Sequence, residues 1–119
     1  MEDTTRIEGE KAHEVFMTHR CEKELHKLLK KDSNGLGEWM NTATAELSAD
    51  PTLGIGLRRG LLPGHECRAI HSKDNRYRIV YIVEEGKVLI LGVGHRSNIY
   101  DDITNAYVRS QGENRKRLR

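Results

Sequence analysis

The longest apolar pattern in the chain lies between residues 77 and 95, where two runs flank Glu84-Glu85-Gly86. Both runs are rich in valine, isoleucine and tyrosine, which favour strands. Strand-like runs on either side of a glycine-containing turn are typical of a β-hairpin. A type I turn with Gly86 in the left-handed conformation predicts a three-residue loop between strands at 77–83 and 87–95.

The loop length fixes the register of this hairpin, because side chains alternate between the two faces of a sheet. A three-residue loop places Arg78 opposite Gly92, and Gly94 and Arg96 follow on the same face. The two glycines would then leave a trough beside two arginines. The alternative is that both arginines pair with carboxylates and that the glycines mark a bulge. The other, core face is predicted to carry Tyr77, Ile79, Tyr81, Leu89, Leu91 and Val93.

The remaining patterns predict helices and strands around the hairpin. Apolar residues recur at helical spacing before and after the turn Asp32-Ser33-Asn34-Gly35, which predicts a helical hairpin. Helices are expected over residues 22–31, 36–49 and 99–109, and further strands over residues 13–18 and 65–71. The order β-α-α-β-β-β-α predicts an α+β fold. A small, antiparallel-rich four-stranded sheet is expected to pack against the N-terminal helical hairpin, with a short C-terminal helix.

A chain of 119 residues predicts one domain, which we place at residues 12–109. Residues 1–11 are expected to form a flexible extension, and residues 110–119 a basic, disordered tail. No leader pattern opens the sequence, and no apolar run approaches the ~20 residues of a membrane span, so a cytoplasmic protein is expected. In a reducing compartment, Cys21 and Cys67 are expected to be free, buried or half-buried thiols.

The net charge of +2 conceals an uneven distribution. Residues 1–52 hold 7 Lys and Arg against 11 Asp and Glu, a balance of −4, whereas residues 53–119 hold 13 against 7, a balance of +6. An anionic partner such as nucleic acid is therefore expected for the second half. The alternative is that the last five residues, which supply four of these positive charges, form only a solvated tail.

Side chains of the second half suit cleavage of RNA through the ribose 2′-hydroxyl. This reaction needs a base, an acid and positive charge around the phosphorane, and no metal. The candidates are Arg68, Arg78 and Arg96 for charge, His71 and His95 for proton transfer, and Tyr100 for stacking or hydroxyl donation. Each residue alone is weak evidence for a site; a single histidine on a strand, for example, is more often structural. Their combination at one end of the sheet carries the hypothesis.

Metal and cofactor sites are not expected. No pair of histidines or cysteines has HxxxH or CxxC spacing, and His19 and His26 lack an evident third ligand. The glycines between residues 54 and 60 lack the Lys-Ser/Thr that follows a phosphate-binding loop. A nucleotide-hydrolysing enzyme is therefore disfavoured.

Residues 13–105 resemble the RelE/ParE superfamily of type II toxin–antitoxin toxins, in its RelE-like branch. The resemblance is carried by AELSADPTLG (45–54), LRRGLLPGHECRAI (57–70), RYRIVYIVEEGKVLILGVGHR (76–96) and SNIYDDI (97–103). Its most specific part is a strand that ends in Gly-His-Arg and is followed by a tyrosine. The resemblance implies a ribosome-dependent endoribonuclease that cleaves mRNA in the A site by metal-independent 2′-hydroxyl attack.

The resemblance also implies functional residues. Arg78 is similar to the family arginine at the start of the middle strand, Arg96 to the one that ends the last strand, and Tyr100 to a base-stacking tyrosine. Ile70 departs from the pattern, because a second basic residue is expected there, and Arg96 and Tyr100 are closer together than in some RelE proteins. The expected catalytic residues are Arg68, Arg78, His95, Arg96 and Tyr100, and the expected substrate-binding residues are Arg58, Arg59, His71, Lys73 and Arg76.

The implied partners are a cognate antitoxin, mRNA and the 70S ribosome, but no membrane. An acidic, amphipathic antitoxin helix is expected to cover the basic site, and a toxin–antitoxin hetero-oligomer is one possible assembly. One alternative is a ParE-like toxin that inhibits DNA gyrase and cleaves no nucleic acid. Another is an inactive remnant that binds only its antitoxin.

Overall fold

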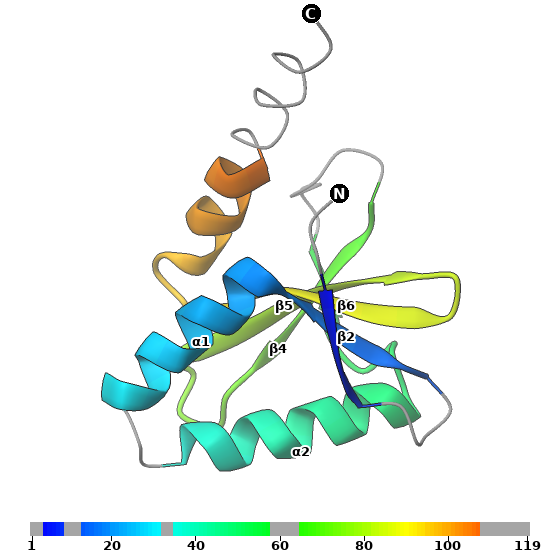
Figure 1. Ribbon diagram of the computed structural model, residues 1–119, viewed down its shortest axis with the longest axis horizontal. Coiled ribbons are helices and arrows are strands. Elements are labelled where there is room, and N and C mark those ends of the chain that lie inside the picture. Colours follow the sequence, from blue (N-terminus) through cyan, green and yellow to red (C-terminus); the bar gives the residue numbers. More distant parts are fainter. Residues whose placement is uncertain (1–3, 9–12, 32–34, 58–64, 108–119) are drawn as a thin grey trace, which may run out of the picture.

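A computed structural model describes residues 4–8, 13–31, 35–57 and 65–107 of the chain. The fold is α+β, as predicted, with all the strands in one sheet of order β1-β2-β6-β5-β4-β3 (Figure 1). The labelled elements are β1 (Thr4–Glu8), β2 (Val15–Thr18), α1 (His19–Lys31), α2 (Leu36–Ala49), β3 (Ile55–Gly56), β4 (Cys67–His71), β5 (Tyr77–Glu84) and β6 (Lys87–His95). A C-terminal helix occupies residues 99–107.

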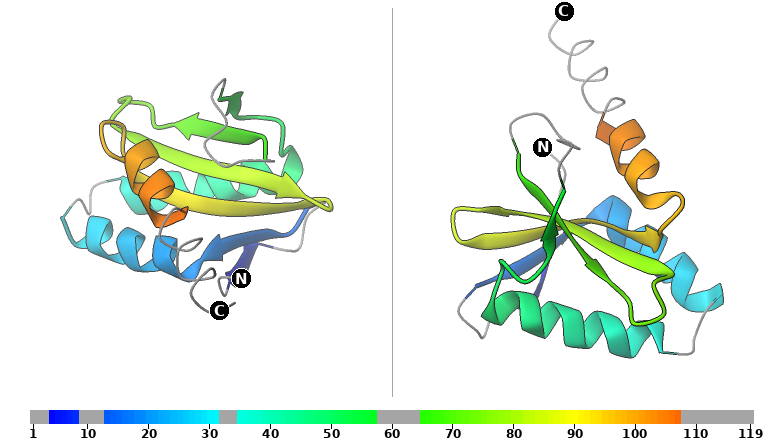
Figure 2. Two further views of the ribbon diagram at one scale, coloured as in Figure 1. Left: turned by 90° about the horizontal axis from the view of Figure 1, so that it is seen from above. Right: turned by 180° about the vertical axis from the view of Figure 1, so that it is seen from behind.

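The central strands β5 and β6 are buried on both faces. On one face, Ile79, Tyr81 and Ile90 pack in a cluster with residues of α1 and α2. On the other face, a second cluster includes Ile99 and Ile103 of the C-terminal helix. Figure 2 shows α1 and α2 on one side of the sheet and the C-terminal helix on the other. Burial on both faces explains why the two strands read as nearly continuous apolar runs.

Two strands lie where the sequence predicted none, so the sheet has six strands rather than four within the described residues. The first, β1, lies inside the predicted flexible extension and pairs antiparallel with β2, whose other edge pairs parallel with β6. The second, β3, lies in the predicted connection and pairs antiparallel with β4. Both are edge strands too short or too polar to give an alternating pattern, and pairing with a neighbour stabilises them.

The hairpin turn differs from the prediction. Glu84 pairs with Lys87, so the loop has two residues rather than three. Glu85 and Gly86 have φ values of +51° and +76°, the left-handed conformations of a type I′ turn. Such a turn matches the right-handed twist of the flanking strands. Its first position usually holds glycine or asparagine, but in this hairpin it holds Glu85.

A β-bulge shifts the register a second time. Tyr81 pairs with Ile90 and Val80 with Gly92, so Leu91 is an extra residue of β6. The two-residue loop, which pairs Ile82 with Leu89, places Leu89 and Leu91 on the side of the C-terminal helix, so their predicted placement on the core face is wrong. Arg78 lies opposite Gly94 rather than Gly92.

The predicted helices are confirmed over the described residues. Thr18 ends β2, and its Oγ1 accepts a hydrogen bond from the Cys21 N–H at 3.2 Å, which caps the start of α1. The bounds of α2 agree with the prediction, and the C-terminal helix is confirmed as far as residue 107. Cys21 and Cys67 are buried thiols outside any disulfide bond, as expected. Among the described residues, no helix is long and apolar enough to cross a membrane.

Candidate functional site

Basic and imidazole side chains gather at one end of the sheet. His71 ends β4 and pairs with Arg78 of β5, while His95 ends β6 and pairs with Tyr77. The chain continues so that the Arg96 N–H donates to the Arg76 carbonyl at 2.8 Å. We call this group the cationic end; its members are His71, Lys73, Arg76, Arg78, His95 and Arg96. All six were expected site residues, and the structure places them at one end of the sheet, with His71 and Arg78 on one face and His95 on the other.

Arg78 is the buried member of the cationic end, with 8% of its surface exposed. Its Nη1 donates to the carbonyls of Asn75 at 3.0 Å and Tyr77 at 3.3 Å. These carbonyls satisfy donors of the guanidinium but do not neutralise its charge, and no carboxylate among the described residues forms an ion pair with it. The alternative that Arg78 pairs with Asp or Glu is therefore not what the structure shows.

The environment of His71 keeps its imidazole neutral. Partial desolvation by the neighbouring residues lowers the pKa of His71 below its ordinary value of 6.5, and the positive charge of Arg78 lowers it further. At neutral pH the ring is therefore unprotonated and can accept a proton. Its exposed position at the end of β4 leaves it accessible to a bound molecule.

The turn between β4 and β5 is held by Asp74. Its carboxylate accepts hydrogen bonds from the Ser72 Oγ at 2.7 Å, the Arg76 N–H at 3.2 Å and the Arg76 Nε at 2.7 Å. These bonds, with that from Ser72 the strongest, lower the pKa of Asp74 to about 2. The Arg76 guanidinium lies 5.3 Å from the centre of the Tyr77 ring, a cation–π geometry. The turn thus fixes Arg76 beside the aromatic ring.

His95 is exposed, and its orientation is set by Ser97. The Ser97 N–H donates to the His95 Nδ1 at 3.2 Å, and the Ser97 Oγ lies 2.8 Å from the same nitrogen. Because Nδ1 accepts, the proton of the neutral ring lies on Nε2. The ring also meets Tyr77 edge to face, with centroids 6.2 Å apart. The role of Ser97 was missed from the sequence, although a serine two residues after a histidine is a recognisable local signal.

Arg96 is a cation of the group that a ligand can reach. It is exposed in the turn that follows β6. Its guanidinium forms no hydrogen bond or ion pair with any residue that the structure describes. A planar guanidinium of this kind can meet two phosphate oxygens at once.

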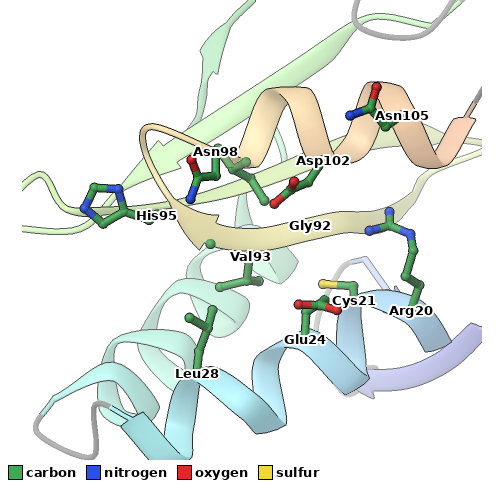
Figure 3. Close-up of a pocket in the computed structure, with 12 residues that line it drawn as sticks. Arg20, Cys21, Glu24, Leu28, Gly92, Val93, His95, Asn98, Asp102 and Asn105 are labelled. Carbon is green, nitrogen blue, oxygen red and sulfur yellow. The ribbon is translucent and has the colours of Figure 1, made fainter.

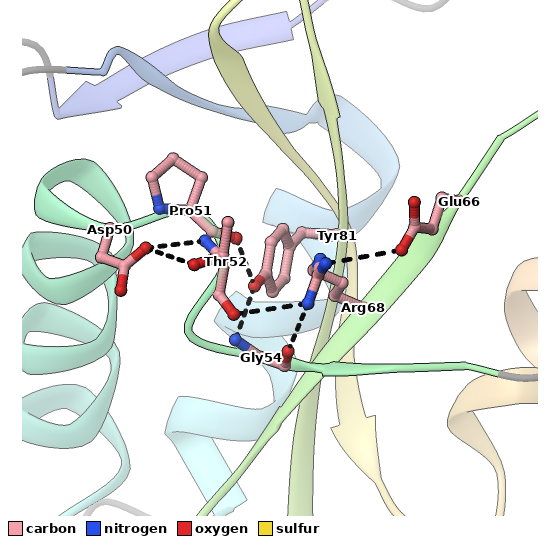
Figure 4. A network of polar contacts seen from close by, with 7 residues as sticks. All are labelled: Asp50, Pro51, Thr52, Gly54, Glu66, Arg68 and Tyr81. Atoms are coloured by element: carbon pink, nitrogen blue, oxygen red, sulfur yellow. Dashed lines mark hydrogen bonds and ion pairs between the residues drawn. The ribbon is translucent and has the colours of Figure 1, made fainter.

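Arg68 lies apart from the cationic end. It precedes His71 by three residues on β4, roughly 10 Å along the strand, and alternation places the two on opposite faces. Its Nη1 donates to the Gly54 carbonyl at 2.9 Å and the Thr52 carbonyl at 3.3 Å, and its Nη2 contacts Glu66 at 3.4 Å (Figure 4). The contacts of Arg68 hold the loop after α2, and the structure does not bring this residue to the other candidates.

The other expected site residues have different surroundings. Tyr100 is half-buried in the first turn of the C-terminal helix and packs against the cluster that contains Ile99 and Ile103. It follows the cationic end closely along the chain, but part of its ring is used in packing. Arg58 and Arg59 lie outside the described residues.

A cavity of about 720 Å³ lies between α1, β6 and the C-terminal helix. In Figure 3, His95 is at one end of this cavity and Arg20 at the other. Glu24 and Asp102 place carboxylates on facing helices, which makes the cavity unfavourable for RNA phosphates. Within the described parts of the chain, no group of three or more His, Cys, Asp or Glu side chains could hold a metal ion.

Comparison with protein families identifies the chain. Residues 15–100 match the family described as the ParE toxin of the type II toxin–antitoxin system, parDE. The chain belongs to this family. The expected membership of the RelE/ParE superfamily is confirmed, and the protein is the toxin of a type II pair whose partner is a cognate antitoxin. No match was found among curated proteins or among solved structures.

Proposed function

We propose that this ParE-family toxin is a ribosome-dependent endoribonuclease that cleaves mRNA in the A site, and that the cationic end is its catalytic site. The observation that carries the proposal is the pairing of His71 with the buried charge of Arg78, together with His95 on the next strand at the same end of the sheet. The only carboxylate in the adjoining turn, Asp74, is already bound by Arg76. The site therefore has uncompensated positive charge for a phosphodiester.

Each residue has a role that follows from its surroundings. The neutral His71 accepts the proton of the ribose 2′-hydroxyl, whose oxygen attacks the phosphorus. The Nε2–H of His95 donates to the phosphate, and the exposed guanidinium of Arg96 binds its non-bridging oxygens. The bond from phosphorus to the 5′-oxygen then breaks, and that oxygen takes its proton from water. The products are a 2′,3′-cyclic phosphate and a free 5′-hydroxyl.

The first prediction concerns Arg96. Its replacement by alanine should lower the rate of mRNA cleavage by ~10²-fold, the usual effect of losing one group that stabilises a transition state. Cleavage is measured by primer extension on a translating reporter mRNA with purified ribosomes. Lys27→Ala, at an exposed position of α1, is the matched control and should cleave at the wild-type rate. Wild-type cleavage by a folded Arg96→Ala protein would contradict the site assignment.

Inhibition of DNA gyrase is the second candidate function. The description of the matched family as the ParE toxin of parDE favours it, and the half-buried Tyr100 is less available for base stacking than the nuclease hypothesis expects. Induced expression in a bacterium separates the candidates. New translation-dependent 5′ ends support the nuclease, whereas intact mRNA with DNA damage supports gyrase. Absence of growth arrest would indicate a remnant that only binds its antitoxin.

A further inference from the structure

A second cavity, of about 370 Å³, lies between the start of α2 and the turn that joins β4 to β5. Trp39 of α2 and Tyr77 of β5 both line it, and each is half-buried. Lys73 and Arg76 line its side nearest the turn. Figure 1 shows the start of α2 close to this turn. The cavity therefore combines two aromatic side chains with two basic and two acidic ones, and one of the acidic ones, Asp74, is already bound by Arg76.

This cavity is continuous with the cationic end. Lys73 and Arg76 belong to both, and the Tyr77 ring lines the cavity and also meets the His95 ring. A polynucleotide whose phosphate lies beside His95 and Arg96 thus has a neighbouring nucleotide within reach of the cavity. Lys73 and Arg76 would contact the backbone of that nucleotide, which favours RNA over an acidic peptide helix with no flat ring to insert.

We infer that the cavity binds an unpaired purine base of the RNA, next to the phosphate that is cleaved. The inference rests on the proposed function and adds a substrate preference to it. Aromatic side chains stack on any base, and the larger face of a purine gains most from two such side chains. Trp39 also packs against the main core cluster, so its ring is held in place before a base binds.

Glu38 makes guanine the preferred purine. It lines the cavity and is exposed, and it forms no hydrogen bond or ion pair with the residues that the structure describes. An ionised carboxylate only accepts hydrogen bonds. Guanine presents two adjacent donors on its Watson–Crick edge, the ring N–H and the amino group, so that one carboxylate can bind both. Adenine offers only its amino group on that edge.

Trp39 is the only tryptophan of the chain, so its fluorescence reports on the cavity alone. Titration of the full-length toxin with GMP, AMP, CMP and UMP should quench this fluorescence, with the lowest dissociation constant for GMP. Glu38→Gln should weaken GMP binding by about tenfold and bring it close to AMP. Glu46→Gln, exposed two turns later on the same helix, is the matched control and should bind as the wild type.

The outcomes separate this inference from the proposed function. Quenching by purines without mRNA cleavage would support the cavity and overturn the nuclease proposal. Cleavage without quenching by any nucleotide would overturn the cavity and leave the nuclease in place. Equal quenching by all four nucleotides, unchanged by Glu38→Gln, would overturn purine recognition.

Discussion

At the scale of single residues, Tyr81 links the sheet to the loop that follows α2. The residue is fully buried. Its hydroxyl donates to the Pro51 carbonyl at 2.8 Å and accepts from the Gly54 N–H at 2.8 Å. Burial is the main cause of its raised pKa, so the hydroxyl stays protonated and can keep both bonds. The same loop provides the carbonyls that bind Arg68.

Tyr81→Phe should therefore lower the free energy of unfolding by about 1–3 kcal/mol, because a buried carbonyl and a buried N–H each lose their partner. Urea unfolding followed by circular dichroism measures the change. Tyr100→Phe is a suitable comparison, since its hydroxyl has no hydrogen bond to the described residues, and it should unfold within about 0.5 kcal/mol of the wild type. Equal stability of Tyr81→Phe and wild type would show that water replaces the lost bonds.

The residue scale also shows where sequence reasoning about the site reached its limit. Positive charge and proton-transfer groups at the end of β6 could be predicted, because Gly-His-Arg closes an apolar run. The separation of Arg68 from the other candidates could not, because it depends on which face of β4 each residue occupies. Nor could the burial of Arg78, which depends on the carbonyls of a turn whose conformation includes Asn75 at φ +63°.

At the scale of elements, the glycines of β6 accommodate the C-terminal helix. A Cβ at Gly92 would lie 2.7 Å from the Ile103 Cδ1 and 2.8 Å from the Ile99 Cδ1. A Cβ at Gly94 would lie 3.2 Å from the Ile99 Cδ1. These glycines were predicted to open a trough for a ligand beside the arginines. The structure gives them a packing role instead, and a bulge precedes Gly92, as the alternative had it.

Gly92→Ala should lower the free energy of unfolding by about 1–3 kcal/mol through overpacking against the C-terminal helix. Ile103→Ala alone should cost about 2–5 kcal/mol by leaving a cavity. In the double variant the new methyl group occupies part of that cavity, so the two losses should add to less than their sum. Urea unfolding of the four proteins of this cycle measures the coupling, and strict additivity would contradict direct contact.

Elements were predictable where their own sequence determines them. The bounds of α2 follow from its apolar spacing and from Asp50-Pro51 after it, and they agree with the structure. In contrast, β1 and β3 exist because β2 and β4 offer free edges, a property of the assembled sheet. The short loop of the hairpin was missed because Glu85 is an unusual residue for a left-handed conformation.

At the scale of the whole molecule, the stability of the toxin depends on charge at the cationic end. The pKa of His71 is lower in the folded protein than its ordinary value of 6.5, so the folded state binds fewer protons than the unfolded state below that pH. The titration of His71 therefore leaves the free energy of unfolding unchanged above about pH 6.5. It lowers the free energy of unfolding as the pH drops toward the pKa of the folded state. Other titrating groups also make the stability depend on pH. The contribution of His71 is therefore measured as the difference between the wild type and a His71 variant.

His71→Gln should remove this contribution. The free energy of unfolding of the wild type relative to the variant is expected to be constant above about pH 7 and to decrease as the pH falls below about 6.5. Urea denaturation at a series of pH values measures the difference, and NMR titration of the His71 ring gives its pKa directly. A midpoint at or above 6.5 would contradict the electrostatic description of the site.

The bulge at Leu91 limits how this hairpin can be used outside its own fold. If Leu91 paired evenly instead of forming the bulge, each later residue of β6 would move one position along β5, and Gly94 would lie opposite Tyr77 rather than Arg78. A transplant of β6 onto an evenly paired hairpin would therefore fail to reproduce the toxin's charge arrangement. The smallest portable unit is the complete β5–β6 hairpin, with its bulge retained.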